Sequence, residues 1–294
     1  MRMRSGRSRR PRMRVRPLSG VSVNRMVPNV LTLLALCAGM TAVRFALGGN
    51  FEVAVFSIIA AGVFDGLDGR MARLLKATSS FGAELDSLSD FVSFGVAPAA
   101  VLYLWTLSDL HGLGWAIALL FAVCCALRLA RFNTEAAHEL PSYAAPFFTG
   151  APAPAGAGLV MVPMFLSFEW GDWLFRSPYL NALTVTGIAL LMVSKVPTVS
   201  LKRIRIPHHL VVPTLLAFGV ATAFLTTEPW LTLTVVGIVY VGSVPLTIRS
   251  YYRLKRAAEA RKPDTVEKPE PVPLPTPAAF PLGEANPPPT EWRH

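Results

Sequence analysis

The sequence predicts an all-α protein that crosses a membrane about eight times. Of its residues, 52% are hydrophobic and only 16% are charged, a composition that is typical of polytopic membrane proteins. The apolar residues gather in eight segments, each close to the ~20 residues that a helix needs to cross ~30 Å of hydrocarbon. Basic residues are concentrated in alternate connections between these segments. These observations exclude an ordinary soluble globular domain.

The eight apolar segments form one transmembrane domain with a polar tail at each end. The segments cover residues 28–47, 51–73, 82–106, 113–131, 151–169, 179–195, 210–226 and 230–248. Residues 1–20 read as a disordered arm, because they are rich in arginine and poor in apolar residues. Residues 21–250 form the transmembrane domain. Residues 251–294 read as a tail that begins basic and then becomes rich in proline and disordered.

The distribution of basic residues predicts the orientation of the chain. The connections after the second, fourth and sixth segments, and the exit after the eighth, are rich in lysine and arginine, whereas the opposite connections hold a single basic residue, Arg176. By the positive-inside rule, both termini face the cytoplasm of a cell's inner membrane. Because membrane topology accounts for the net charge of +10, we expect no nucleic-acid partner.

The three cysteines do not predict a metal or redox site. Cys37, Cys124 and Cys125 lie within apolar segments and lack the spacing of metal ligands. We therefore expect buried, inert thiols and no disulfide framework.

Four aspartates stand out, because carboxylates at membrane depth are costly and usually mark a functional site. They are Asp65, Asp68, Asp86 and Asp90. On a helix, Asp65 lies ~21 Å from the start of its segment, while Asp86 and Asp90 lie ~9 and ~15 Å inward from the cytoplasmic surface. The connection between the two segments is short, so the helices are antiparallel neighbours. The two pairs of carboxylates therefore reach a similar depth.

Small residues and one arginine share helix faces with these acids. The first face holds Asp65, Asp68, Gly69, Ala72 and Arg73, and the second holds Gly82, Asp86 and Asp90. Their spacings are i, i+3, i+4, i+7, i+8 and i, i+4, i+8, so each set forms one stripe. The glycines and the alanine leave room for a ligand or for the backbone of the partner helix.

Converging carboxylates repel one another in a low dielectric unless a divalent cation neutralises them. A site made only of oxygen ligands suits Mg²⁺ or Mn²⁺ and argues against zinc or copper. A nearby arginine, Arg73, could bind phosphate in bidentate fashion, which indicates a phosphate-bearing substrate. An ion transporter, whose acids bind the carried ion, stays open at this point. So does simple pairing of the acids with basic residues.

The same residues resemble the signature of the CDP-alcohol phosphotransferases. That signature is D-x2-D-G-x2-A-R-x8-G-x3-D-x3-D, and it spans Asp65 to Asp90 here. Other stretches are similar to one branch of the family, the bacterial membrane phosphatidylserine synthases. They are residues 27–40, 81–99, 126–133, 147–159 and 194–207. The resemblance covers about residues 20–250, and a transporter has no reason to reproduce the glycine, alanine and arginine spacing.

The resemblance implies a six-helix catalytic core, here with two further helices, that assembles as a homodimer. It implies the synthesis of phosphatidylserine and CMP from CDP-diacylglycerol and L-serine, with two divalent ions, Mg²⁺ or Mn²⁺. The serine hydroxyl would attack in line, without a covalent protein intermediate. Glycerol-3-phosphate, inositol phosphate or choline would be alternative acceptors, but residues 126–133 and 194–207 favour serine.

The resemblance also implies roles for particular residues. Asp65, Asp68 and Asp86 would hold one ion, while Asp90 would complete a second site or stand close by and act as the general base. The CDP-lipid would be bound by Gly69, Ala72, Arg73, Gly82, Asn29 and Thr32. Serine carries a carboxylate, so we expect cationic and amide partners at the cytoplasmic level. The candidates are Arg128, Arg131, Asn133 and Lys202.

Overall fold

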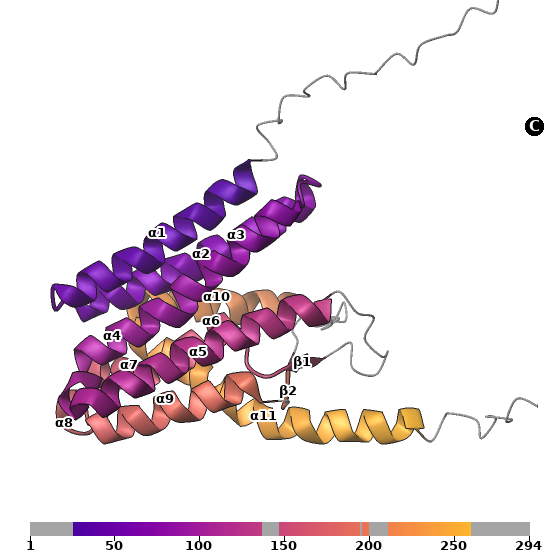
Figure 1. Ribbon diagram of the computed structural model, residues 1–294. Helices are drawn as coiled ribbons and strands as arrows, with labels where there is room; N and C mark the ends of the chain where they lie inside the picture. Colours follow the sequence, from indigo (N-terminus) through magenta and orange to yellow (C-terminus); the bar gives the residue numbers. More distant parts are fainter. Residues whose placement is uncertain (1–25, 137–146, 195, 200–210, 260–294) are drawn as a thin grey trace, which may run out of the picture.

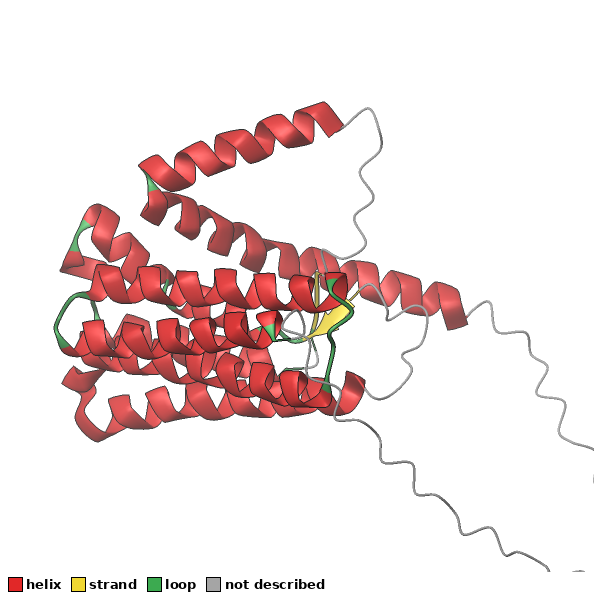
Figure 2. Ribbon diagram, turned by 90° about the horizontal axis from the view of Figure 1, so that it is seen from above, coloured by secondary structure: helices red, strands yellow, loops and turns green. Residues whose placement is uncertain are grey.

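The chain folds into a bundle of helices that run broadly side by side (Figure 1). The structure, a computed structural model, describes residues 26–136, 147–194, 196–199 and 211–259. The predicted basic arm and most of the predicted tail lie outside the described residues. Helices make up nearly all of the described residues, and a short pair of strands lies at one end of the bundle (Figure 2). The predicted all-α class is confirmed, with this strand pair as an unforeseen addition.

The helices follow the predicted segments closely. Six segments are single helices: α1 (Val27–Leu47), α2 (Phe51–Leu74), α5 (His111–Ala136), α9 (Pro178–Val193), α10 (Val211–Thr227) and α11 (Pro229–Glu259). The third segment divides into α3 (Ser80–Asp90), the π-helix η2 (Phe91–Val96) and α4 (Ala97–Trp105). The fifth divides into α6 (Ala153–Val160) and α7 (Val162–Trp170). Two short helices, η3 (Leu107–Leu110) and α8 (Asp172–Phe175), occupy connections.

Prolines explain why two of the segments are divided. Proline lacks an N–H, and inside a helix its ring collides with the carbonyl four residues earlier. Ahead of Pro98 the helix widens, and the amide of Ala97 donates to the carbonyl of Val92, five residues back. Pro163 similarly lies in the first turn of α7, directly after the break at Met161. The π-helical turn begins immediately after Asp90, and such turns are frequent at functional sites.

Length and composition make this a polytopic membrane protein. Five helical stretches are long and apolar enough to cross a bilayer: Val27–Leu47, Ser80–Trp105, Leu107–Thr134, Ala153–Trp170 and Pro229–Ser250. Two shorter apolar helices are α9 and α10. Helix α2 has 24 residues but carries the charged residues of the aspartate motif. The count of eight crossings stays a prediction.

Helix α11 is longer than its apolar segment. It runs to Glu259, whereas the transmembrane domain was expected to end at residue 250. The basic beginning of the predicted tail is therefore a continuation of this helix. Arginines in its last turns, including Arg253 and Arg256, are exposed.

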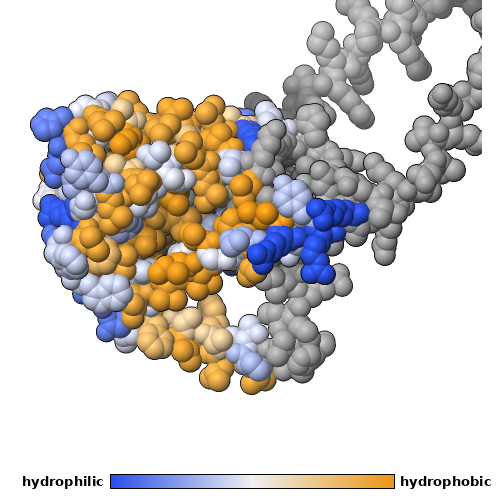
Figure 3. Space-filling model, turned by 90° about the horizontal axis from the view of Figure 1, so that it is seen from below, coloured by the Kyte–Doolittle hydropathy of each residue, from blue (hydrophilic) through white to orange (hydrophobic). Residues whose placement is uncertain are grey.

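The described chain begins and ends at the same end of the bundle. Figure 1 shows the start of α1, the α2–α3 turn and the end of α11 on one side, and α8 on the other. Seen from below, hydrophobic side chains cover the middle of the surface, while hydrophilic ones gather toward its two ends (Figure 3). This arrangement matches a protein with a bilayer around its middle.

Two strands join loops that are far apart in the sequence. Strand β1 (Phe147–Thr149) pairs antiparallel with β2 (Pro197–Val199), with Phe148 opposite Thr198. The amide of Gly150 extends the contact by donating to the carbonyl of Val196 at 2.8 Å. Gly150 has φ +73°, and a Cβ there would collide with the carbonyl of Met192, so this position requires glycine. Two stretches with the family resemblance, 147–159 and 194–207, thus meet through β1 and β2.

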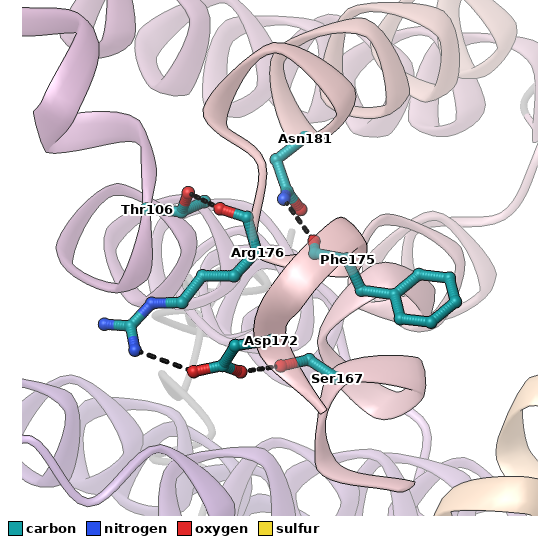
Figure 4. A network of polar contacts seen from close by, with 6 residues as sticks. All are labelled: Thr106, Ser167, Asp172, Phe175, Arg176 and Asn181. Atoms are coloured by element: carbon teal, nitrogen blue, oxygen red, sulfur yellow. Dashed lines mark hydrogen bonds and ion pairs between the residues drawn. The ribbon is translucent and has the colours of Figure 1, made fainter. Parts of the chain in front are cut away.

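A polar network closes the opposite end of the bundle (Figure 4). Asp172 accepts a hydrogen bond from Ser167 and forms an ion pair with Arg176. The Nη1 atom of Arg176 lies 3.0 Å from Oδ2 of Asp172. Thr106 donates to the carbonyl of Arg176 at 2.7 Å, and Asn181 donates to a carbonyl of α8 at 2.8 Å. The Ser167 hydroxyl, together with the Arg176 guanidinium, holds the pKa of Asp172 below its usual value.

The cysteine prediction is right for two of the three residues. Cys124 and Cys125 are buried in the core of the bundle, and Cys125 packs against Gly95 of η2. Cys37 is exposed on α1, so the prediction of a buried thiol is wrong there. An apolar segment in a membrane has a lipid-facing side, and hydropathy alone does not separate that side from the core.

Candidate active site

The α2–α3 hairpin positions the four aspartates. Helix α3 begins at a Ser79 cap, whose Oγ accepts the amide of Gly82 at 3.0 Å. The short turn before this cap reverses the chain, with Lys76 in the left-handed region at φ 49°. Both helices then carry their carboxylates away from the turn, toward the interior of the bundle.

Three of the carboxylates converge. Asp65, Asp68 and Asp86 each offer an oxygen atom, and these atoms all lie within 4.8 Å of one another. Asp68 is buried, with 5% of its surface exposed, and the other two are partly buried. A compact set of partly buried carboxylate oxygens is compatible with binding a divalent ion. Among the described residues, no other group of acids, histidines or cysteines has this geometry.

Asp90 lies beside this group and not within it. Its carboxyl lies close to that of Asp65. It also interacts electrostatically with the guanidinium of Arg128 on α5. The structure therefore brings all four predicted acids together, and Asp90 is within electrostatic range of a cation.

Helix α1 contributes a hydroxyl to the carboxylate group. The Oγ1 of Thr32 donates to Oδ2 of Asp68 at 2.7 Å, and Thr32 is only 4% exposed. Two serines of the α3–η2 segment hold α1 in place, because Ser89 donates to the carbonyl of Thr32 and Ser93 to that of Ala35, at 3.0 and 3.1 Å.

A cavity of about 150 Å³ opens beside Asp68 and Asp86. It is lined by residues of α1, α2, α3 and the α2–α3 turn: Pro28, Asn29, Thr32, Asp68, Gly69, Ala72, Ala77, Thr78, Ser79, Gly82, Ala83 and Asp86. Five of the six residues predicted to bind the CDP-lipid are in this set. The sixth, Arg73, is exposed and folds back over α2, with Nη1 4.0 Å from the place where a Gly69 Cβ would stand.

Gly82 is tightly enclosed in this cavity. A Cβ at this position would lie 3.0 Å from Oδ1 of Asn29 and 3.1 Å from Oγ of Ser79. Asn29 therefore projects from α1 across the cavity toward the start of α3. By contrast, Gly66 of α2 has no neighbour within 4 Å of an added Cβ.

The four predicted acceptor residues do not all lie together. Arg128 interacts electrostatically with Asp90, as described above. Asn133 donates to Oγ of Ser87 on α3 at 2.9 Å. Arg131 turns toward the end of α9, where its Nη1 lies 3.4 Å from the carbonyl of Val193. Lys202 lies outside the described residues.

A second, apolar cavity of about 240 Å³ lies one helical turn deeper than the carboxylates. Gly62, three residues before Asp65, and Phe94, four residues after Asp90, both line it. Residues of α6, α7 and α11 complete the lining: Pro154, Ala155, Ala157, Gly158, Leu159, Met161, Phe165, Leu233, Val236, Gly237 and Tyr240, with Ile58 and Ile59 of α2. Tyr240 also interacts electrostatically with Arg128.

Sequence reasoning missed several of these residues. Ser89 and Ser93 lie four residues apart within an apolar segment, so their spacing could have marked a contact between helices. Tyr240 and Gly158 carry no such signal, because they approach the site only through the packing of α6 and α11.

The fold and site define an integral membrane protein with a carboxylate cluster that is compatible with divalent metal. A family model described as CDP-alcohol phosphatidyltransferase matches residues 25–196, more than half of the chain. A second model, CDP-alcohol phosphatidyltransferase 2, matches residues 209–245. The chain therefore belongs to the CDP-alcohol phosphatidyltransferase family, which confirms the resemblance seen in its motif.

Curated relatives carry a more specific name. A protein of Mycobacterium tuberculosis is 40% identical over 227 residues, which cover 77% of this chain and 79% of the relative. One of Mycobacterium leprae is 38% identical over 250 residues, covering 84% and 83%. One of Bacillus subtilis is 37% identical over 170 residues, covering 58% and 88%. All three are named CDP-diacylglycerol--serine O-phosphatidyltransferase.

Proposed function

We propose that this protein transfers the phosphatidyl group of CDP-diacylglycerol to the hydroxyl of L-serine, forming phosphatidylserine and CMP. The observation that carries the proposal is the convergence of Asp65, Asp68 and Asp86 beside a cavity lined by the other motif residues. The name shared by relatives from several bacteria supports serine as the acceptor.

The CDP headgroup would occupy the first cavity. Its pyrophosphate would lie against Asp68 and Asp86, which together with Asp65 would hold a divalent ion that offsets the phosphate charge. Gly69 and Gly82 allow the nucleotide to approach the helices closely, and Arg73 pairs with a phosphate oxygen. Asn29, which projects across the same cavity, offers an amide to the nucleotide.

One acyl chain of the lipid would enter the second cavity. This cavity lies deeper in the bundle than the carboxylates, and its lining is apolar apart from Tyr240. Val236 is exposed at the rim, toward the surrounding lipid. A diacylglycerol whose phosphate lies at the aspartates has its chains directed toward this depth.

The three-carboxylate group would hold Mg²⁺ or Mn²⁺. When bound, such an ion withdraws charge from the phosphoryl oxygens and stabilises the leaving CMP. Asp90 takes the proton of the serine hydroxyl as the Oγ attacks the lipid-side phosphorus. The bond between that phosphorus and the CMP oxygen breaks in the same step, so no covalent intermediate with the protein is required. A second ion would need Asp90 as a ligand.

Arg128 would bind the carboxylate of serine. Its guanidinium interacts electrostatically with Asp90, so a serine held by Arg128 would have its hydroxyl on the side of the base. Asn133 and Lys202 stay candidates for further contacts to serine. Arg131, which is turned toward Val193, has a structural role in this arrangement.

The site would face the cytoplasm of the cell membrane, and the chain would act as a homodimer. The basic connections support this orientation, because the positive-inside rule places them in the cytoplasm. The start of α1 and the end of α11 lie at the same end of the bundle as the aspartate hairpin, which fits both termini on that side.

An acceptor assay tests the proposed function. Purified protein in mixed micelles receives CDP-diacylglycerol and either labelled serine, glycerol-3-phosphate, inositol phosphate or choline, with and without Mn²⁺. We expect CMP release and labelled lipid only with serine and metal. Release with another alcohol would reassign the acceptor within the same chemistry. Metal flux in proteoliposomes without any CMP formation would overturn the enzymatic proposal.

A further inference from the structure

We infer that Thr32 is a positioning residue for Asp68, a predicted metal ligand, and that Ser89 holds Thr32 in place. This role differs from the contact to the CDP-lipid expected from the sequence. It deepens the proposed function, because it concerns the same site, and its test measures metal binding directly.

The hydroxyl of Thr32 has two acceptors within reach. Oδ2 of Asp68 lies at 2.7 Å, and the carbonyl of Pro28 lies at 3.1 Å. A threonine hydroxyl has one proton, and a hydrogen bond to a carboxylate is shorter and stronger than one to a neutral acceptor. The proton therefore lies mainly toward Asp68. Both residues are at most 5% exposed, so water cannot readily replace this contact.

Thr41 shows what a threonine of the same helix does without a carboxylate nearby. Its Oγ1 donates only to the carbonyl four residues earlier, that of Cys37, at 2.6 Å. This back-bonding is the ordinary behaviour of threonine inside a helix. Thr32 departs from it because α2 places Asp68 within reach.

The hydrogen bond fixes the carboxyl group of Asp68. This donor restricts the orientation of the carboxyl, because it holds Oδ2 against α1. Each carboxylate oxygen keeps lone pairs for an ion, because it accepts from two directions. A hydrogen bond behind a metal ligand is typically worth 10–100-fold in metal affinity.

Helix α1 carries no acid in the site, yet it is anchored to both helices that do. Ser89 lies on α3 next to Asp90 and donates to the main-chain carbonyl of Thr32 at 3.0 Å. Further along, Gly39 approaches so closely that a Cβ there would lie 2.8 Å from the Cα of Ser93. These contacts clamp α1 to the α3–η2 segment. Thr32 is therefore held where its hydroxyl can donate to Asp68 on α2.

The test compares Thr32→Val, Thr32→Ser and Thr41→Val in the full-length purified protein. Free Mn²⁺ is titrated by electron paramagnetic resonance without CDP-lipid present. We expect Thr32→Val to weaken Mn²⁺ binding by about 10–100-fold. Thr32→Ser keeps the hydroxyl and stays near the wild-type affinity, as does Thr41→Val, the matched control on the same helix.

Mn²⁺ affinity near that of the wild type in Thr32→Val, with weaker binding of CDP-diacylglycerol, would overturn the inference and make Thr32 a nucleotide contact. Should Thr32→Val fail to fold, Ser89→Ala carries the test. This substitution leaves the hydroxyl of Thr32 but removes the hydrogen bond to its main-chain carbonyl. We expect Mn²⁺ affinity to fall several-fold. Unchanged affinity would contradict the inference. The result stands apart from the choice of acceptor, because no turnover is measured.

Discussion

Asp90 of the α2–α3 hairpin and Arg128 of α5 interact electrostatically next to the three-carboxylate group. Residue 90 ends α3, and residue 128 lies in the last third of α5, so only the packing of the bundle brings them together. The pair places a proton acceptor beside a cation. That is the combination that an amino-acid acceptor with a free hydroxyl requires.

Asp90→Asn should abolish turnover and leave metal binding largely intact. The asparagine cannot take the serine proton, so we expect kcat to fall by about 10²–10⁴-fold. Asp90 stands outside the group of Asp65, Asp68 and Asp86, so Mn²⁺ affinity should change little. CMP release and Mn²⁺ titration measure the two effects. A wild-type rate would rule out Asp90 as the base, and a large loss of Mn²⁺ affinity would make it a ligand.

Arg128→Gln should raise the KM for serine with little effect on the KM for CDP-diacylglycerol. A charge-assisted hydrogen bond contributes about 1.5–3 kcal/mol, so the increase should be roughly 10–150-fold. Arg131→Gln is the matched control one turn further along α5, where the side chain turns toward Val193. Equal effects from the two substitutions would show that Arg128 has no special place in serine binding.

Gly82→Ala should impair binding of the CDP-lipid. The added Cβ would lie 3.0 Å from Oδ1 of Asn29, so Asn29 or the start of α3 must shift. We expect the KM for CDP-diacylglycerol to rise by roughly tenfold, since small displacements in a binding site are costly. Gly66→Ala, also in the hairpin but in open space, should behave like the wild type. If both variants are unaffected, the headgroup does not occupy this cavity.

Gly158→Leu should change the preference for acyl-chain length. Gly158 lines the apolar cavity, and an added Cβ meets nothing within 4 Å, so a larger side chain fills the space without a backbone clash. Long chains should lose about tenfold relative to short ones, since each methylene left unburied forfeits ~0.8 kcal/mol. The measurement is kcat/KM for CDP-lipids of graded length. Gly187→Leu, on the exposed face of α9, is the control and should leave the preference unchanged.

Asp172→Asn should remove a pH-dependent contribution to stability. The pKa of Asp172 lies below its usual value in the folded protein, so its contribution is present at neutral pH and is lost as the pH falls through that lowered pKa. Because 56% of the Asp172 side chain is exposed, we expect less than about 1 kcal/mol. At pH 7 the thermal unfolding temperature of the variant should therefore be slightly lower than that of the wild type. This difference should disappear as the pH is lowered.

Asp109→Asn, an exposed acid outside the polar network of Figure 4, is the control for this measurement. A gap between Asp172→Asn and the wild type that grows with acidification would contradict the assigned direction of the pKa shift.

The sequence predicts most of the helices and the place of the acids, because both depend on local regularities. Hydropathy locates the segments, and the helical period with a short connection brings the pairs at 65 and 68 and at 86 and 90 to one level. The pairing of β1 with β2 could not be predicted, since it joins loops nearly fifty residues apart. The π-helical turn had a visible cause in Pro98, but its exact form depends on packing against α1 and α5.

The candidate site divides in the same way. Motif spacing predicts which residues of α2 and α3 share a face. It does not predict which cation of α5 reaches Asp90, because Arg128 and Arg131 are equivalent in the sequence and only helix rotation separates them. The hydrogen bond from Thr32 to Asp68 could not be predicted either, since it depends on the distance between α1 and α2.

The β1–β2 ladder couples two loops that are distant in the sequence, so neither loop can be exchanged without the other. Residues 147–149 and 197–199 exchange main-chain hydrogen bonds, and Gly150 fits against the end of α9 with no space for a side chain. A chimaera that imports residues 194–207 from an enzyme with another acceptor would therefore carry a mismatched partner strand. Transplanting acceptor choice between family members should succeed only when residues 147–159 travel with that segment.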